Sequence, residues 1–239
     1  MQSRPASIPW QDVDTILLDM DGTLLDLAFD NFFWLELVPE RYAALHGLGA
    51  EEARRLIMPR YERVLGTLAW YCVEHWSTEL GLDIVALKHE HRHLISYLPG
   101  ATRFLTAARR RGADLSIVTN AHPDTVTIKA EQTRLDTRVD RIVSSHELEA
   151  AKESEEFWRA LERRQRFDPS RTLLVEDSLP VLRAAQSYGI RHTVAVRRPD
   201  SRQPPRDVAG FPAVDGVADL LSEEGTVRRP ERPEAPPAQ

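Results

Sequence analysis

Two acidic side chains stand two residues apart, directly after a short apolar run. Asp19 and Asp21 follow Thr15-Ile-Leu-Leu, and Gly22 comes next. Since residues i and i+2 of a strand project to the same side, both carboxylates can point into one site. Carboxylates held close together repel, and each favours protonation of the other unless a cation lies between them. A hard divalent ion such as Mg²⁺, which takes oxygen ligands, would relieve this repulsion.

A second acidic pair ends another apolar run. Glu176 and Asp177 follow Arg171-Thr-Leu-Leu-Val. If both runs are strands of one parallel sheet, their carboxyl ends share an edge, where open α/β sheets bind ligands. Taken singly, Asp-Gly is a common turn, and Asp177 or Ser178 could cap the helix that begins near Pro180. Because all four acids are expected at the carboxyl ends of strands in the same sheet, we favour a metal site formed by Asp19, Asp21, Glu176 and Asp177.

Two further groups could bind a phosphate. Thr119 and Asn120 end a strand-like run and open the next helix, so the hydroxyl and nearby backbone N–H groups could hold an anion. Lys152 could place a positive charge on phosphate oxygens, although a solvated helical lysine is the alternative interpretation. Together with the acids, these residues predict a site for phosphoryl chemistry.

The elements that must position these residues follow from the apolar pattern. Short runs rich in branched residues predict buried parallel strands at 15–19, 114–119, 139–143, 171–176 and 191–196. Helical patterns separate them, among others Ala101–Arg111 before Gly112 and Leu179–Tyr188 before Gly189. This alternation predicts the α/β class, with a doubly wound parallel sheet.

The region between the first two strands lacks a strand pattern. It predicts successive helices that break at Pro39, Gly47, Pro59 and Gly81. We therefore expect an α/β core of residues 10–26 and 99–198 and an inserted helical cap of residues 27–98. Residues 199–239 are rich in proline and predict a tail with little core, mobile at residues 228–239, from which Val214 to Leu221 could dock as a short helix.

These motifs resemble those of a known family. Over residues 10–198 the chain is similar to the haloacid dehalogenase-like (HAD) superfamily of phosphotransferases, whose four motifs correspond in order to Asp19-Met-Asp-Gly-Thr-Leu-Leu-Asp26, Thr119-Asn120, Lys152 and Glu176-Asp177. The inserted helices resemble the C1 cap of that family, and its core is Rossmann-like. Lys152 is followed by Glu153, where the family commonly has proline.

Four shorter segments look like the bacterial GMP/IMP nucleotidase branch of that superfamily. They are Trp10-Gln-Asp-Val-Asp-Thr, Leu27-Ala-Phe-Asp-Asn31, Trp70-Tyr-Cys72 and Thr119-Asn-Ala-His-Pro123. The resemblance implies a 5′-nucleotidase that converts GMP and IMP to nucleoside and phosphate. The alternatives are a sugar-phosphate phosphatase or β-phosphoglucomutase-like mutase, which would use the same acids, and a module that binds a phosphorylated ligand without turnover.

The resemblance also implies a role for each motif residue. Asp19 would attack phosphorus to form an aspartyl-phosphate, and Asp21 would protonate the leaving oxygen and later deprotonate water. Mg²⁺ would be held by Asp19, the Asp21 backbone carbonyl and Asp177, with Glu176 as a further ligand. Thr119, Asn120 and Lys152 would stabilise the transferring phosphoryl group. The second acid, Asp21, favours phosphoryl transfer over carbon–halogen hydrolysis.

One predicted cap helix, 68–80, carries two tryptophans in different positions. Leu68, Cys72, Trp76 and Leu80 recur every four residues, which predicts that Trp76 belongs to the core. Trp70 lies off that stripe and is our candidate for stacking on a purine base, with packing on a neighbouring cap helix as the alternative. Asp30, just past the first motif, could reach substrate or cap the first helix of the insert.

The composition of the chain limits the kinds of partner that we expect it to bind. With 31 Lys and Arg against 37 Asp and Glu, the 239 residues carry a net charge of −6, which disfavours binding to nucleic acid. The single Cys72 cannot form an intramolecular disulfide, and no run approaches the roughly 18 apolar residues that span a bilayer. We expect a cytoplasmic protein that acts on a small phosphomonoester, with no membrane or nucleic-acid partner.

Overall fold

A six-stranded parallel sheet forms the centre of the molecule. The computed structural model describes residues 8–208 and 210–221. The strand order is β3-β2-β1-β4-β5-β6, and the strands are β1 Thr15–Leu18, β2 Asp114–Thr119, β3 Arg141–Ser144, β4 Thr172–Glu176, β5 His192–Val196 and β6 Ala213–Val214. All neighbouring pairs are parallel. This sheet confirms the predicted fold class and five of its strands.

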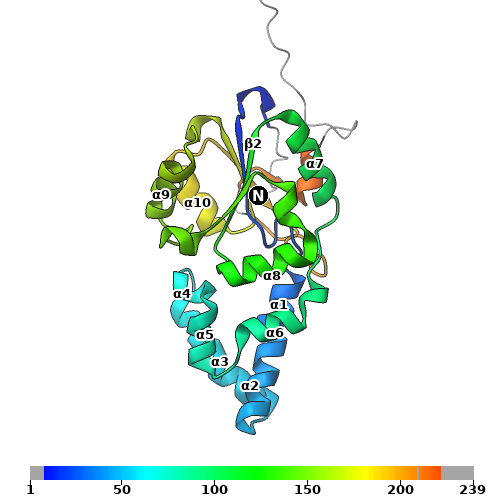
Figure 1. Ribbon diagram of the computed structural model, residues 1–239, viewed down its shortest axis with the longest axis vertical. Coiled ribbons are helices and arrows are strands. Elements are labelled where there is room, and N and C mark those ends of the chain that lie inside the picture. Colours follow the sequence, from blue (N-terminus) through cyan, green and yellow to red (C-terminus); the bar gives the residue numbers. More distant parts are fainter. Residues whose placement is uncertain (1–7, 209, 222–239) are drawn as a thin grey trace, which may run out of the picture.

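Alternating residues of the strands pack against different helices. Ile16 and Leu18 join a cluster with α7 (Ala101–Arg111) and α8 (Pro123–Thr133), whereas Leu17 joins a cluster with α9 (Glu155–Gln165) and α10 (Leu179–Tyr188). Helices therefore cover both faces, with α9 and α10 opposite α7 in Figure 1. The side-chain period of two explains this layering, since every strand is apolar on both faces.

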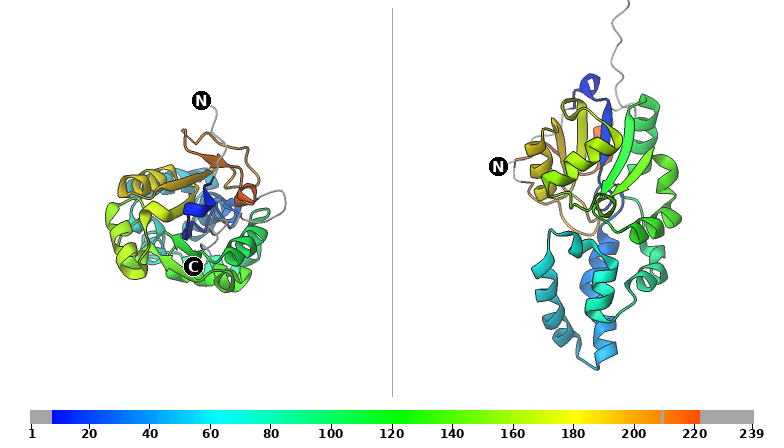
Figure 2. Two further views of the ribbon diagram at one scale, coloured as in Figure 1. Left: turned by 90° about the horizontal axis from the view of Figure 1, so that it is seen from above. Right: turned by 60° about the vertical axis from the view of Figure 1, so that its left-hand side comes forward.

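The predicted insert is helical and lies at one end of the molecule. It contains α1 Ala28–Phe32, a π-helical turn Phe33–Leu37, α2 Val38–His46, α3 Ala50–Val64, α4 Leu68–Tyr71, α5 Val73–Leu80, α6 Ile84–Glu90 and a 3₁₀ turn Arg92–Leu94. Figures 1 and 2 show these helices below the sheet, and we call residues 27–98 the cap. No helix in the part of the chain that the structure describes is long and apolar enough to cross a membrane.

The cap helices break at the glycines and continue through the prolines. Gly47 and Gly81 end α2 and α5 in the left-handed conformation, as predicted. The predicted breaks at Pro39 and Pro59 are wrong. Pro39 follows a π-helical turn, in which its missing N–H would have donated to the carbonyl of Trp34, and the Tyr61 hydroxyl donates to that carbonyl at 3.3 Å instead.

The predicted helix 68–80 consists of two helices. The chain is extended at Cys72, whose sulfur accepts the backbone N–H of His75 and so caps α5. Trp76 is fully buried, which confirms it as a core residue. Leu68, in α4, is only half-buried and lies outside the core cluster that contains Trp76 and Leu80, so the predicted four-residue stripe does not extend through Leu68.

Two adjacent segments join the cap to the core. The Asp26 N–H donates to the Ser96 carbonyl at 2.9 Å, and the Leu98 N–H donates to the Leu24 carbonyl at 2.9 Å. Leu25 and Tyr97 form an antiparallel bridge between these bonds. The start and end of the cap are therefore held side by side, next to the end of β1.

Part of the predicted tail belongs to the core. Ala213 and Val214 pair with β5 as β6, and a 3₁₀ helix, Val217–Leu220, packs against α7. The expectation of little core is thus wrong here, because the spaced apolar residues after the prolines are buried: Val208, Phe211, Ala213, Val214, Val217 and Leu220. The predicted docking of residues 214–221 as a helix is confirmed for Val217–Leu220. The mobile end predicted at residues 228–239 lies outside the described residues.

Candidate active site

A pocket of about 350 Å³ lies between the carboxyl ends of the strands and the cap. Its volume is within the range of about 300–1,000 Å³ that is common for small-molecule sites. The core side contains every predicted site residue except Trp70: Asp19, Asp21, Thr119, Asn120, Lys152, Glu176 and Asp177. Trp70 lies on the cap side, together with Asp30, Asn31, Trp34, Tyr71 and Lys88. The structure therefore brings all the predicted site residues to one pocket.

At the base of the pocket, Lys152 joins the two strand ends that carry acids. Its ammonium donates to Asp19 Oδ1 at 2.5 Å, to Glu176 Oε2 at 2.7 Å and to the Val118 carbonyl at 2.9 Å. Lys152 is 2% exposed and lies in the loop before α9. The alternative interpretation of Lys152 as a solvated helical lysine is therefore wrong.

Asp177 meets a basic residue from the segment after β5. Arg206 Nη2 lies 3.2 Å from Asp177 Oδ2 and also donates to the Asp177 carbonyl. On the other side of Asp177 is Gly22, whose φ is +83° and where an added Cβ would lie 2.8 Å from Asp177 Cγ. Gly22 therefore allows the turn after β1 to approach the second pair of acids closely.

The three carboxylates at this edge fit a divalent cation. Asp19, Glu176 and Asp177 each offer an oxygen, and these atoms lie within 4.8 Å of one another. Burial, together with the charges of neighbouring carboxylates, raises the pKa of Asp19 to about 8, of Glu176 to about 7 and of Asp177 to about 6. Lys152 and Arg206 offset only part of this repulsion, so bound positive charge would stabilise the ionised cluster.

The Asp21 side chain belongs to a different network. Lys129 Nζ, from α8, lies 2.6 Å from both Asp21 Oδ1 and Asp30 Oδ2, and Lys88 Nζ, from α6, lies 3.3 Å from Asp30 Oδ1. Burial raises the pKa of Asp21, and the Lys129 ammonium opposes that rise. This network fixes the Asp21 carboxylate beside Asp19. Metal binding by the Asp21 backbone carbonyl stays a prediction.

Thr119 and Asn120, two of the residues predicted to bind phosphate, line the pocket and make hydrogen bonds to nearby residues. Thr119 Oγ1 accepts the Ala121 N–H at 3.0 Å, and Asn120 Oδ1 accepts the Lys152 N–H at 2.9 Å. The Asn120 amide donates to Glu153, which also accepts from the Tyr71 hydroxyl of the cap at 3.0 Å. The helix expected directly after Asn120 begins only at Pro123. Glu153 thus links Asn120 of the core to Tyr71 of the cap.

Aromatic side chains form the cap wall of the pocket. Trp70 packs against Trp34, Tyr61 and Trp76, with ring centroids 6.1, 5.2 and 5.8 Å away. Trp70 and Trp34 also line the pocket. Trp70 both packs within the cap and lines the pocket. The interpretation as a packing residue and the interpretation as a base-stacking residue therefore both have support.

The sequence reasoning missed Lys88, Lys129 and Arg206, and it left Asp30 with two roles. Asp30 does not cap the first helix, because the Asp26 carboxylate accepts the Ala28 N–H there. A signal for the lysines was present: the only three lysines among 31 basic residues are Lys88, Lys129 and Lys152. All three are at most 2% exposed. A chain that uses arginine as its surface cation thus places its lysines at the site.

Comparisons with known proteins show what the chain is similar to. A family model described as haloacid dehalogenase-like hydrolase matches residues 13–189. The GMP/IMP nucleotidase YrfG of Escherichia coli (strain K12) is 40% identical over 215 residues, which cover 90% of this chain and 97% of that protein.

Solved structures support the fold. An HAD phosphatase from Thermococcus onnurineus has a TM-score of 0.73 at 20% identity and covers 87% of this chain and 96% of its own. The defluorinating L-2-haloacid dehalogenase Rha0230 has a TM-score of 0.62 at 20% identity and covers 90% and 97%. Because one fold serves two chemistries in these structures, the reaction must be inferred from the residues of the site.

Proposed function

Because this chain belongs to the haloacid dehalogenase-like hydrolase family, we propose that it is a Mg²⁺-dependent phosphomonoesterase acting on purine nucleoside 5′-monophosphates, GMP and IMP above all. The observation that carries this proposal is the position of Asp19, buried at the end of β1 against Lys152 and next to a second acid, Asp21. A nucleophile, a cation and an acid thus meet at the base of one pocket.

In the first step, an Asp19 oxygen attacks phosphorus, and the bond from phosphorus to the ester oxygen breaks. Asp21 gives its proton to that oxygen, so the nucleoside leaves as a neutral alcohol and Asp19 carries the phosphoryl group. The raised pKa of Asp21 favours a proton on this carboxyl, and Lys129 holds it in place. Lys152 orients Asp19 and offers positive charge to the phosphoryl oxygens.

In the second step, the ionised Asp21 takes a proton from water, which attacks the phosphorus of the aspartyl-phosphate. The bond between phosphorus and the Asp19 oxygen breaks, and inorganic phosphate is released. When bound by Asp19, Glu176 and Asp177, Mg²⁺ neutralises charge on nucleophile and phosphate so that two anions can meet. Asn120 keeps the Lys152 loop in place through its bond to the Lys152 N–H.

The purine preference rests on two supports. The aromatic wall formed by Trp34, Trp70 and Tyr71 faces the acids across the pocket, and a purine offers a large surface for stacking. The curated relative at 40% identity is named a GMP/IMP nucleotidase. We also propose a cytoplasmic location, which the single cysteine favours.

The test is phosphate release from GMP, IMP, AMP, pyrimidine monophosphates and hexose phosphates, with Mg²⁺ and with EDTA. We expect release from GMP and IMP that EDTA abolishes, and a loss of roughly 10⁴-fold or more in Asp19→Asn. Release from hexose phosphates alone would refute the nucleotidase, and an isomerised sugar without free phosphate would favour the mutase. Tight binding of GMP without turnover by the wild type would favour the binding module.

A further inference from the structure

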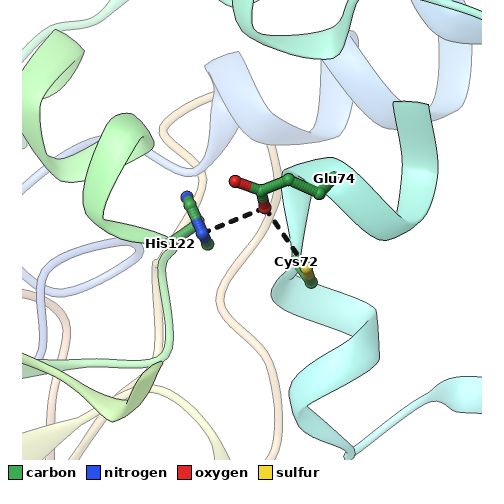
Figure 3. Close-up of side chains that lie close together, drawn as sticks. All are labelled: Cys72, Glu74 and His122. Carbon is green, nitrogen blue, oxygen red and sulfur yellow. Dashed lines mark hydrogen bonds and ion pairs between the residues drawn. The ribbon is translucent and has the colours of Figure 1, made fainter. Parts of the chain in front are cut away.

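A second group of metal-binding side chains lies where the cap meets the core (Figure 3). Cys72 and Glu74 come from the cap, at the start of α5, and His122 comes from the core, before α8. Glu74 Oε2 accepts from Cys72 Sγ at 3.3 Å and lies 3.1 Å from His122 Nε2. Three side chains from two segments about fifty residues apart in the sequence thus converge on one point.

The distances suit a single tetrahedral ion. Sγ, Oε2 and Nε2 lie within 4.8 Å of one another. Ligand atoms bound to one tetrahedral zinc at about 2.0–2.3 Å are separated by about 3.3–3.8 Å. Only small movements of these side chains would be needed to bring all three into contact with an ion. A water molecule would take the fourth position, and solvent can reach the site because the Glu74 side chain is 63% exposed.

The donor types select the kind of ion. A thiolate and an imidazole are ligands for zinc and related transition metals, whereas Mg²⁺ takes oxygen. The neighbouring groups match this use. The His75 N–H donates to Cys72 Sγ at 3.4 Å, a bond that favours the thiolate. His122 Nδ1 accepts the Asp124 N–H at 3.3 Å; with an ion on Nε2 the ring proton would lie on Nδ1, and Asp124 Oδ2, 3.7 Å away, would be the nearby acceptor.

We propose that Cys72, Glu74 and His122 form a site for Zn²⁺ or a similar transition-metal ion, separate from the carboxylates of Asp19, Glu176 and Asp177. The ion would join the cap to the core at the edge of the pocket, since His122 lines that pocket, as do the neighbours of Cys72, Tyr71 and Val73. Its binding would hold the cap against the core and slow turnover, a consequence that rests on the proposed function.

Co²⁺ is the probe for the site itself, because a cobalt–thiolate bond has a charge-transfer absorption that oxygen ligands lack. The full chain is titrated with Co²⁺ in the presence of excess Mg²⁺, which occupies the carboxylate site. We expect this absorption at one ion per chain in the wild type and also in Asp19→Asn. Its absence from the wild type would overturn the proposal, whatever the activity of the enzyme.

The variants are chosen to preserve the caps of the helices. Ser is a good N-cap, so Cys72→Ser keeps the start of α5 and should abolish the absorption. Asn can likewise cap α8 but is too short to reach Glu74, so His122→Asn should weaken Co²⁺ binding roughly 10–100-fold. The control is His89→Gln, an exposed histidine of α6. Equal affinity in His122→Asn and the wild type would refute the site.

Turnover gives an independent readout. With Mg²⁺ in excess, Zn²⁺ should inhibit hydrolysis by the wild type, and Cys72→Ser should need roughly 10–100-fold more Zn²⁺ for the same inhibition. Equal inhibition of both proteins would show that Zn²⁺ acts at the carboxylates, which would refute the link to the cap. If the protein hydrolyses no phosphomonoester, the proposed function fails, while the Co²⁺ titration still decides the metal site.

Discussion

Replacing Asp19 by Asn should stabilise the protein in the absence of metal, and the gain should grow with pH. Burial and the charge of Glu176 together raise the pKa of Asp19 from 3.8 to about 8, against the opposing charge of Lys152. The folded state therefore disfavours the ionised carboxylate. An Asn side chain has the same shape and carries no charge, so the variant avoids this unfavourable ionisation.

The magnitude follows from the two pKa values. Between pH 3.8 and about 8 the folded state keeps a proton that the unfolded state has lost, so the free energy of unfolding falls as pH rises, by about 1.4 kcal/mol per pH unit. At pH 7 this gives an upper limit of about 4 kcal/mol. Lys152 loses one charged partner and keeps Glu176, which offsets part of the gain. We expect about 2–4 kcal/mol, or roughly 4–16 °C in Tm.

The assay is thermal and urea unfolding in EDTA at several pH values from about 4 to about 8. The two proteins should have equal stability near pH 4 and diverge as pH rises. Added Mg²⁺ should stabilise the wild type far more than Asp19→Asn. The control is Asp14→Asn, because Asp14 is exposed and Arg171 lowers its pKa. This control should lose a little stability at neutral pH.

Two results would refute this reasoning. A difference between the proteins that stays constant from about pH 4 to about pH 8 would show that ionisation of Asp19 is not the unfavourable step. A wild type that Mg²⁺ does not stabilise at neutral pH would show that the three carboxylates do not bind this ion.

Three further outcomes are expected. Lys129→Met leaves the partly buried Asp21 without its ammonium, so the free energy of unfolding should fall by about 3–5 kcal/mol. The pH–rate profile should also shift to higher pH because the pKa of Asp21 rises, and an unchanged profile would contradict the network. Trp70→Ala should raise KM for purine monophosphates by roughly 5–150-fold and leave KM for a small phosphate ester nearly unchanged. An equal rise in KM for both kinds of substrate would show that Trp70 acts by packing alone. Gly100→Ala introduces a Cβ 2.6 Å from Ala218 Cβ at a residue whose φ is +77°, so Tm should fall by several degrees. An equal Tm in the variant and the wild type would show that the 3₁₀ helix at 217–220 is not docked there.

The sheet and its acids could be predicted from the sequence because both follow from local patterns. A strand buried on both faces is a short run of branched apolar residues, and a residue that follows such a run lies at the edge of the sheet. Asp19 and Glu176 were found in this way. The helices 101–111 and 179–188 end at glycines that adopt the left-handed conformation, which is also a local signal.

The rest depends on contacts between distant segments. Lys129 meets Asp21 across 108 residues, and no local pattern shows that a lysine in a polar helix is buried. Arg206 comes from a segment whose prolines indicated little core, yet two residues of that segment complete the sheet. Pro39 is tolerated because a distant tyrosine replaces the missing donor. Such compensation appears only when the chain is folded.

The position of β6 and Arg206 also sets the order in which the site is completed during synthesis. Asp19 leaves the ribosome first, and Arg206 and the strand Ala213–Val214 follow almost two hundred residues later. Until they emerge, β5 is an unpaired edge and Asp177 lacks its guanidinium. A nascent chain can therefore contain all four acids and both site lysines of the core without being a finished enzyme, because the segment that closes the edge of its sheet is made after them.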